Sequence, residues 1–217
     1  MLVIMGTLTI LTLGFLLGIR HAVDPDHVVA VGTMATRTAS LRSSAMVGAL
    51  WGLGHTVTLL GVGGVIVVWR SALAPRMALA MEFGVALMLI TLGVMNLLMA
   101  RGADPRPPTA ARPVAVGMVH GMAGSAAIAI LVLTTIQSSM VGVLYLLLFG
   151  MGTITGMVIV TAAVVIPATR VMAQIGVPRR WMILTAGVVS IAFGLGMVAM
   201  LGGPEALLAA GHGPGQR

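Results

Sequence analysis

The chain has 217 residues, of which 59% are hydrophobic and only 8% are charged, and its mean hydropathy is +1.10. Soluble domains carry about 25% charged residues, so this composition excludes a soluble globular protein and indicates a multi-pass membrane protein. The net charge of +7 reflects twelve arginines against five acidic residues. The arginines lie mostly between apolar runs, a distribution typical of membrane orientation rather than of nucleic-acid binding. The absence of cysteine excludes thiol redox chemistry, thiolate metal sites and disulfides.

Six apolar segments along the chain are long enough to cross a membrane. We expect helices over residues 2–36, 45–69, 79–100, 114–136, 139–166 and 181–202. The predicted fold class is an all-α integral membrane protein with six transmembrane helices in a single domain, 1–202. Its halves cover about 1–100 and 114–202, joined by a loop-like linker over 101–113, and residues 203–217 are expected to form a flexible tail.

The first segment is too long for one straight crossing. A helix of about 35 residues measures about 52 Å, against a hydrocarbon core of about 30 Å. Pro25 lies within this segment, and its ring and missing N–H disrupt a helix and free the carbonyl of His21, four residues earlier. We therefore expect the helix to be tilted or broken near Pro25, with irregular backbone that lines a cavity.

Arginines are unevenly distributed between the two sides of the predicted bundle. Eight lie in gaps that share one side, and three lie on the other. By the positive-inside rule the first side is cytoplasmic, which places both termini outside a cell (inner) membrane. The first set is Arg37, Arg42, Arg101, Arg106, Arg112, Arg170, Arg179 and Arg180, and the second is Arg70, Arg76 and Arg217.

The second half of the chain repeats features of the first. Residues 18–21 (Gly-Ile-Arg-His) match 117–120 (Gly-Met-Val-His), and residues 52–55 (Gly-Leu-Gly-His) match 150–153 (Gly-Met-Gly-Thr). A further match, with equal spacing, joins Gly84 and Gly93 to Gly187 and Gly196. Offsets of 99, 98 and 103 predict two three-helix halves of opposite orientation, an inverted 3+3 repeat with its site near the midplane.

The run Arg20-His21-Ala22-Val23-Asp24-Pro25-Asp26-His27 concentrates ionisable residues in an otherwise apolar chain. Such residues at membrane depth are costly and usually mark an ion or substrate pathway. Histidines with carboxylates and no cysteine favour a borderline divalent metal such as Ni²⁺ or Co²⁺. A straight helix would point His21 and His27 about 120° apart, whereas a break at Pro25 lets them converge.

The acids of this run have different expected roles. Arg20 and Asp24 have i, i+4 spacing and are expected to form an ion pair. Asp24 is therefore expected to serve both this ion pair and the metal site. Asp26 is therefore the more direct metal ligand.

Two more histidines are candidates for the same site. His55 lies in the second predicted helix, after a glycine that permits close helix approach, and His120 lies in the fourth, at the position related to His21. For both, a histidine that only hydrogen-bonds between helices remains an alternative. Asn96 is expected to make an interhelical hydrogen bond rather than to bind metal. The candidate ligands are His21, Asp24, Asp26, His27, His55 and His120.

The spacing His21-x4-Asp26-His27 and the run Gly-His-Thr-Val-Thr around His55 resemble the nickel/cobalt transporter family, whose motif is written HX4DH. The closest resemblance is to its compact six-helix members of the urease-accessory type. It implies secondary transport of Ni²⁺ or Co²⁺, with His21, Asp26 and His27 as metal-recognition residues, no cofactor and no enzyme activity. Its implied partners are the metal ion, the lipid bilayer and metallochaperones or metalloenzyme-maturation proteins, but not nucleic acid.

The chain departs from this family where Pro25 replaces a frequent alanine, and it lacks the downstream acidic signatures of the eight-helix permeases. Two other functions stay open beside transition-metal transport. One is an intramembrane metalloenzyme, which would need a catalytic base such as the glutamate of His-Glu-x-x-His, a motif the chain lacks. The other is a carrier of the same plan for another small solute.

Metal binding requires neutral histidine and ionised aspartate, so protons compete with the metal, which offers a route to proton coupling. We predict that Ni²⁺ binding to the purified protein weakens as the pH falls through the histidine range, near about pH 6.5 for a free imidazole. Ni²⁺ titrations at a series of pH values measure this. An affinity that stays flat from about pH 5 to 8 would contradict the predicted ligands.

Overall fold

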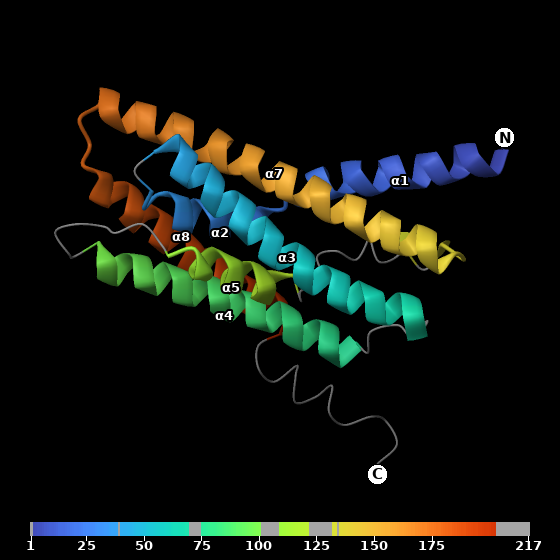
Figure 1. Ribbon diagram of the computed structural model, residues 1–217. Helices are drawn as coiled ribbons and strands as arrows, with labels where there is room; N and C mark the ends of the chain where they lie inside the picture. The colour runs from blue at the N-terminus through green and yellow to red at the C-terminus, as the bar shows by residue number, and fades with distance from the viewer. Residues whose placement is uncertain are drawn as a thin grey trace, which may run out of the picture.

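The computed structural model describes residues 2–38, 40–69, 75–100, 109–121, 132–133 and 135–202. The elements within these residues are helices arranged in an elongated bundle (Figure 1). They are α1 (Leu2–His21), α2 (Pro25–Ala35), α3 (Leu41–Trp69), α4 (Pro75–Met99), α5 (Ala111–His120), α7 (Ser139–Gln174) and α8 (Arg179–Met200). The predicted all-α class is therefore confirmed for the described part of the chain.

Five candidate membrane spans occur in the described residues. α3, α4, α7 and α8 each contain a stretch long and apolar enough to cross alone, and α1 with α2 passes the same test as a pair bent by 58°. The predicted break of the first helix is thus confirmed. The helix predicted over 114–136 starts as α5 and ends at His120, and residues 122–131 lie outside the described residues. Seven helices are described where six were predicted.

Some predicted boundaries are wrong. α5 begins at Ala111, so the last part of the predicted linker is helical, while residues 101–108 and 203–217 lie outside the described residues. The helix predicted to end at residue 166 continues through Pro167 to Gln174. Membrane helices tolerate an internal proline more readily than soluble ones do, so Pro167 does not end α7.

The break between α1 and α2 satisfies its own backbone groups. The Val23 N–H donates to the Arg20 carbonyl at 3.0 Å, and the Asp24 N–H donates to the His21 carbonyl at 3.1 Å. Pro25 occupies the first position of α2, where a missing N–H costs no hydrogen bond. The His21 carbonyl, which Pro25 was expected to free, therefore accepts a turn hydrogen bond.

Glycines allow the helices to pack backbone against backbone. A Cβ added at Gly18 on α1 would collide with the Phe149 carbonyl on α7, and one at Gly117 on α5 would collide with the Trp51 carbonyl on α3. The two pairs are related by offsets of 99 and 98, so α5 packs on α3 as α1 packs on α7. The reciprocal contacts, with the same offsets, are those of Gly152 with Phe15 and of Gly54 with Val114.

The third predicted match is wrong in register. Gly84 and Gly196 have no neighbour that a Cβ would meet within 4 Å in the described chain, so nothing in the packing relates them. The related contacts between α4 and α8 have an offset of 101 instead. They are those of Gly93 with Gly187 and Ile191, and of Gly194 with Ala86 and Ile90.

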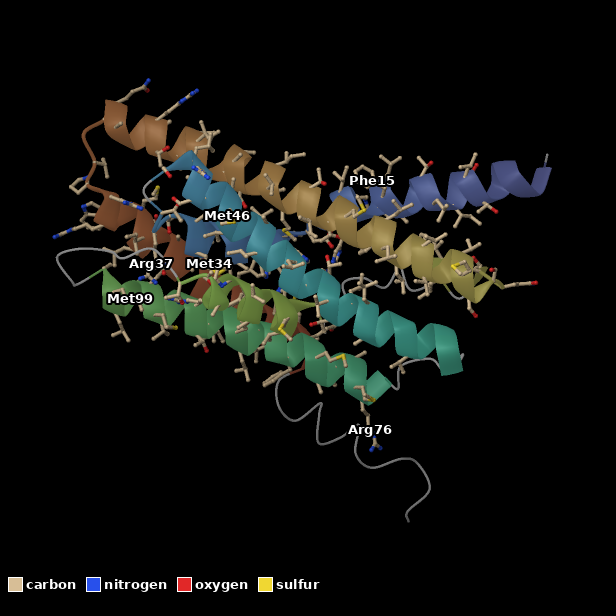
Figure 2. The ribbon with its side chains drawn as sticks, in the orientation of Figure 1. Phe15, Met34, Arg37, Met46, Arg76 and Met99 are labelled. Atoms are coloured by element: carbon tan, nitrogen blue, oxygen red, sulfur yellow. The ribbon has the colours of Figure 1, made fainter. Side chains whose placement is uncertain are left out.

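Three described arginines of the predicted cytoplasmic set, Arg37, Arg112 and Arg179, lie near the C-terminal end of α2. Arg37 lies at the end where α4 finishes at Met99, and Arg76 lies at the opposite end (Figure 2). Burial lowers the pKa of Arg37, and the neighbouring Arg112 charge acts in the same direction. Arg179 donates to carbonyls that follow α2, of Thr36 at 3.1 Å and of Thr38, and so places positive charge at the negative end of that helix.

The glycine contacts predict an asymmetry between two conservative substitutions. Gly152→Ala on α7 should lower the free energy of unfolding by about 1–3 kcal/mol, because its Cβ meets the Phe15 carbonyl. Gly61→Ala on α3 is the matched control, since a Cβ there has no described neighbour within 4 Å. It should leave stability unchanged or raise it by up to about 1 kcal/mol. Thermal or denaturant unfolding in detergent measures both, and equal stabilities would contradict the packing.

Candidate metal site

The six candidate ligands lie together where α1 ends, α2 begins and α5 ends beside α3. The four imidazoles and the Asp26 carboxylate are buried, and Asp24 is partly exposed. The candidates are His21 at the end of α1, Asp24 in the break, Asp26 and His27 in the first turn of α2, His55 in α3 and His120 at the end of α5. Residues 99 positions apart, His21 and His120, thus occupy equivalent helix ends.

His21 links the helix break to α3. Its Nδ1 lies 2.9 Å from Oδ2 of Asp24, and its Nε2 lies 3.2 Å from Nε2 of His55. A carboxylate only accepts hydrogen bonds, so Nδ1 of His21 carries the proton, and in the neutral imidazole Nε2 then offers a lone pair. The carboxylate thereby fixes the imidazole in the tautomer that a metal at Nε2 requires.

The predicted ion pair between Arg20 and Asp24 is wrong. Asp24 pairs with His21 instead, and no Arg20–Asp24 bridge occurs among the described residues. An i, i+4 pair requires a continuous helix, and the chain leaves α1 at His21, so Asp24 is not on the helix face that Arg20 occupies.

Asp26 bridges two imidazoles from different helices. Its Oδ1 lies 3.1 Å from Nδ1 of His27, and its Oδ2 lies 3.1 Å from Nε2 of His120. The two histidine nitrogens lie 3.3 Å from each other. The N-terminal half of α2 therefore contacts α5 through a carboxylate with one histidine on each side.

Three buried imidazole nitrogens have no hydrogen-bond partner among the described residues. They are Nε2 of His27, Nδ1 of His55 and Nδ1 of His120. Buried polar atoms are normally paired, and an unprotonated imidazole nitrogen is a common metal donor. These nitrogens, together with the carboxylates, form a donor set suited to Ni²⁺ or Co²⁺.

The donor atoms fall into two groups of three. One group is His21, His27 and His55, and the other is Asp26, His27 and His120. Within each group, one donor atom per residue lies within 4.8 Å of the others. Both groups contain His27, which therefore lies at the centre of the cluster.

Two aromatic side chains beside the histidines were missed by the sequence analysis. The Trp51 ring lies 5.4 Å from that of His120, and the Phe149 ring lies 5.5 Å from that of His21. Both are buried and 98 positions apart, so the repeat offset was the signal that could have identified them. Thr153, the counterpart of His55, donates to the Phe149 carbonyl at 2.9 Å.

The prediction for Asn96 is confirmed. Its Nδ2 donates to the Thr33 carbonyl at 2.7 Å and joins α4 to α2.

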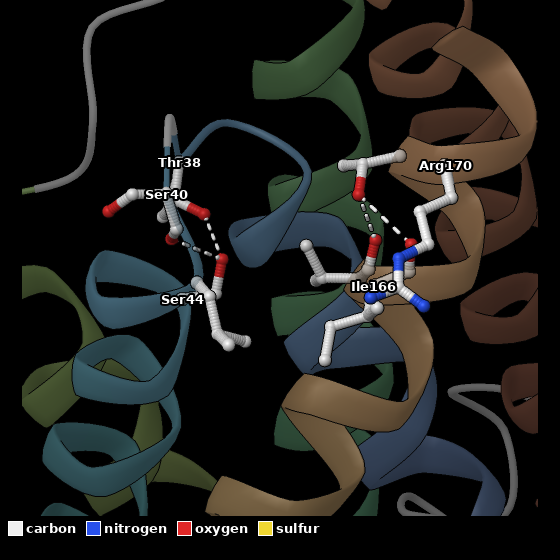
Figure 3. A pocket seen from close by; sticks show the side chains of 8 residues that line it. Thr38, Ser40, Ser44, Ile166 and Arg170 are labelled. Carbon is white, nitrogen blue, oxygen red and sulfur yellow. Dashed lines mark hydrogen bonds between the residues drawn. The ribbon is translucent and has the colours of Figure 1, made fainter. Parts of the chain in front are cut away.

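A separate pocket lies between the turn that joins α2 to α3 and the C-terminal part of α7 (Figure 3). None of the six candidate ligands lines it, so it is distinct from the histidine cluster. Its lining residues are Thr38, Ser40, Leu41, Ser44, Val165, Ile166, Thr169 and Arg170.

The chain matches one protein-family model and two known proteins. Residues 7–103 match the family model NicO, described as high-affinity nickel-transport protein. The chain is 33% identical over 217 residues to the urease accessory protein UreH of Bacillus sp. (strain TB-90), covering 92% of this chain and 95% of that protein. It is 27% identical over 222 residues to the chloroplast protein FOR GROWTH AND FERTILITY 1 of Arabidopsis thaliana, covering 89% of this chain and 60% of that protein. No solved structure is significantly similar.

The contact between His21 and Asp24 predicts an effect on metal affinity. Asp24→Asn should weaken Ni²⁺ binding by up to about 10-fold, because the amide no longer fixes the tautomer of His21. Arg20→Gln is the control and should leave the affinity unchanged, since Asp24 pairs with His21 instead. Competition with a chelating dye measures both. A loss in Arg20→Gln equal to that in Asp24→Asn would show that the ion pair matters after all.

Proposed function

Because this chain belongs to the family of high-affinity nickel-transport proteins, we propose that it is a secondary transporter of Ni²⁺, Co²⁺ or both across the cell membrane. The family is one of transporters, so the metalloenzyme alternative is set aside, and the metal ion is cargo rather than a resident cofactor. The same ligand chemistry serves nickel and cobalt, which are adjacent in the order of metal affinities.

One observation carries this proposal: at a helix break, two buried imidazoles each face the Asp26 carboxylate with one ring nitrogen, and their other ring nitrogens have no described partner. His21, Asp26 and His27 would hold the ion, with His55, His120 and Asp24 assisting. A buried carboxylate offsets part of the charge of a divalent ion, and the imidazoles supply donors of suitable softness. Proton competition at these ligands would couple transport to the proton gradient.

The site would lie near the membrane midplane between two inverted three-helix halves. The glycine contacts that repeat with offsets of 98, 99 and 101 support this arrangement, as do the equivalent helix ends at His21 and His120. In such transporters, discontinuous helices meet at the binding site. The arginines at the C-terminal end of α2, which are Arg37, Arg112 and Arg179, support a cytoplasmic location for that end of the bundle, with both termini outside.

The name of the Bacillus relative, urease accessory protein, supports metalloenzyme-maturation proteins or metallochaperones as partners of this transporter. Such partners would take up or supply the ion at the cytoplasmic end.

Titration of the detergent-purified protein with Ni²⁺, Co²⁺, Zn²⁺ and Mg²⁺ tests the proposed site. Ni²⁺ and Co²⁺ should bind, Mg²⁺ should not, and His27→Ala should reduce Ni²⁺ affinity at least 10-fold, because His27 belongs to both donor groups. His212→Ala, in the C-terminal tail, is the matched histidine control and should bind as the unmodified protein does.

Uptake and efflux of radioactive nickel in cells tests transport itself. The unmodified protein should change cellular nickel relative to cells that lack it, and His27→Ala should not. If His27→Ala bound or transported nickel as well as the unmodified protein does, the proposed site would be wrong.

A further inference from the structure

The two ring nitrogens of His27 face different neighbours. Nδ1 lies 3.1 Å from Asp26 and 3.3 Å from His120, whereas Nε2 is buried and has no described partner. The ring centroid of His27 lies 4.4 Å from that of His21 and 5.3 Å from that of His55. The imidazole therefore stands between two sets of donors.

Resting on the proposed transport function, we propose that the cluster offers one metal ion two adjacent positions that share His27. In position A the ligands are His21, His27 and His55, and in position B they are Asp26, His27 and His120. Among the described residues, the donor atoms that lie within 4.8 Å of one another form these two groups of three, which share His27.

The carboxylates have different roles at the two positions. In position A the ion is held by three imidazoles, while Asp24 and Asp26 accept hydrogen bonds from the opposite nitrogens of His21 and His27. Such outer carboxylates orient metal-binding histidines. In position B, Asp26 binds the ion directly, between His27 and His120.

A neutral imidazole offers a lone pair at only one of its nitrogens. His27 can therefore complete position A or position B, but it cannot complete both at once. Two divalent ions at neighbouring positions would also repel each other strongly in a buried site. The cluster consequently holds one ion, which has two coordination environments.

The two positions correspond to opposite approaches to the cluster. α1 carries His21 and α5 carries His120, each as its last residue, and the two helices enter from opposite ends of the bundle (Figure 1). The ion would move when Asp26 and His120 replace His21 and His55 as its ligands while His27 stays bound. It would then pass from ligands on α1 and α3 to ligands on α2 and α5.

A double-mutant cycle separates two positions from one. His55→Ala disables position A and His120→Ala disables position B, and each leaves the other triad intact. Each single variant should bind one Ni²⁺ with an affinity within about 10-fold of the unmodified protein. The double variant should lose far more Ni²⁺ affinity than the product of the two single fold-losses, because each single variant still has one complete position and the double variant has none.

Transport should respond differently from binding. Because the ion must occupy both positions in turn, each single variant should lose at least 10-fold in nickel transport into vesicles while it still binds Ni²⁺. Thr153→Ala, at the position related to His55, is the control and should change neither quantity. His55→Asn and His120→Asn repeat the cycle with polar side chains at the buried positions, in case an alanine variant fails to fold.

Single losses in binding that are large and that multiply in the double variant would overturn the two-position proposal, since they indicate one ion bound by all the ligands together. Normal transport by either single variant would overturn it as well. In both cases the proposed transport function would stand. If the unmodified protein neither bound nor transported Ni²⁺, both proposals would fail.

Discussion

The architecture depends on one constraint: a helix that stops inside a membrane protein must satisfy its backbone polar groups without water. The three residues between α1 and α2 do so through tight turn hydrogen bonds, and Pro25 starts α2 without needing a donor. The break therefore places a helix C-terminus and a helix N-terminus side by side in the bundle. His21 occupies the first, and Asp26 with His27 the second, where a carboxylate is favoured by the helix dipole.

Backbone-to-backbone packing then holds these ends in register with α3 and α5. α1 lies against α7 at Gly18, and α5 lies against α3 at Gly117, with contacts too close for any side chain. The same packing places Phe149 beside His21 and Trp51 beside His120. The imidazoles are consequently enclosed by apolar rings and helices, where an ion would be bound by protein groups rather than by bulk water.

Local chemistry explains how much of this could be predicted from the sequence. The break follows from Pro25 and segment length, and the ligand types follow from the residues of one short run, so both were accessible. The Arg20–Asp24 pair was mispredicted because the i, i+4 argument assumed that the helix continues past His21. The α4–α8 register was missed because glycine spacing alone does not identify which glycines face another helix. The grouping of donors around His27 depends on where α3 and α5 place His55 and His120, which no local pattern specifies.

Nickel K-edge X-ray absorption spectroscopy of the purified, Ni²⁺-loaded protein tests most directly whether the buried histidine and aspartate cluster binds the ion. Nitrogen and oxygen ligands with imidazole scattering are expected, and His27→Ala should lose that scattering. The chain has 18 methionines and no cysteine, so sulfur ligation would have to come from methionine. A sulfur-dominated spectrum, or imidazole scattering that persists unchanged in His27→Ala, would contradict the account.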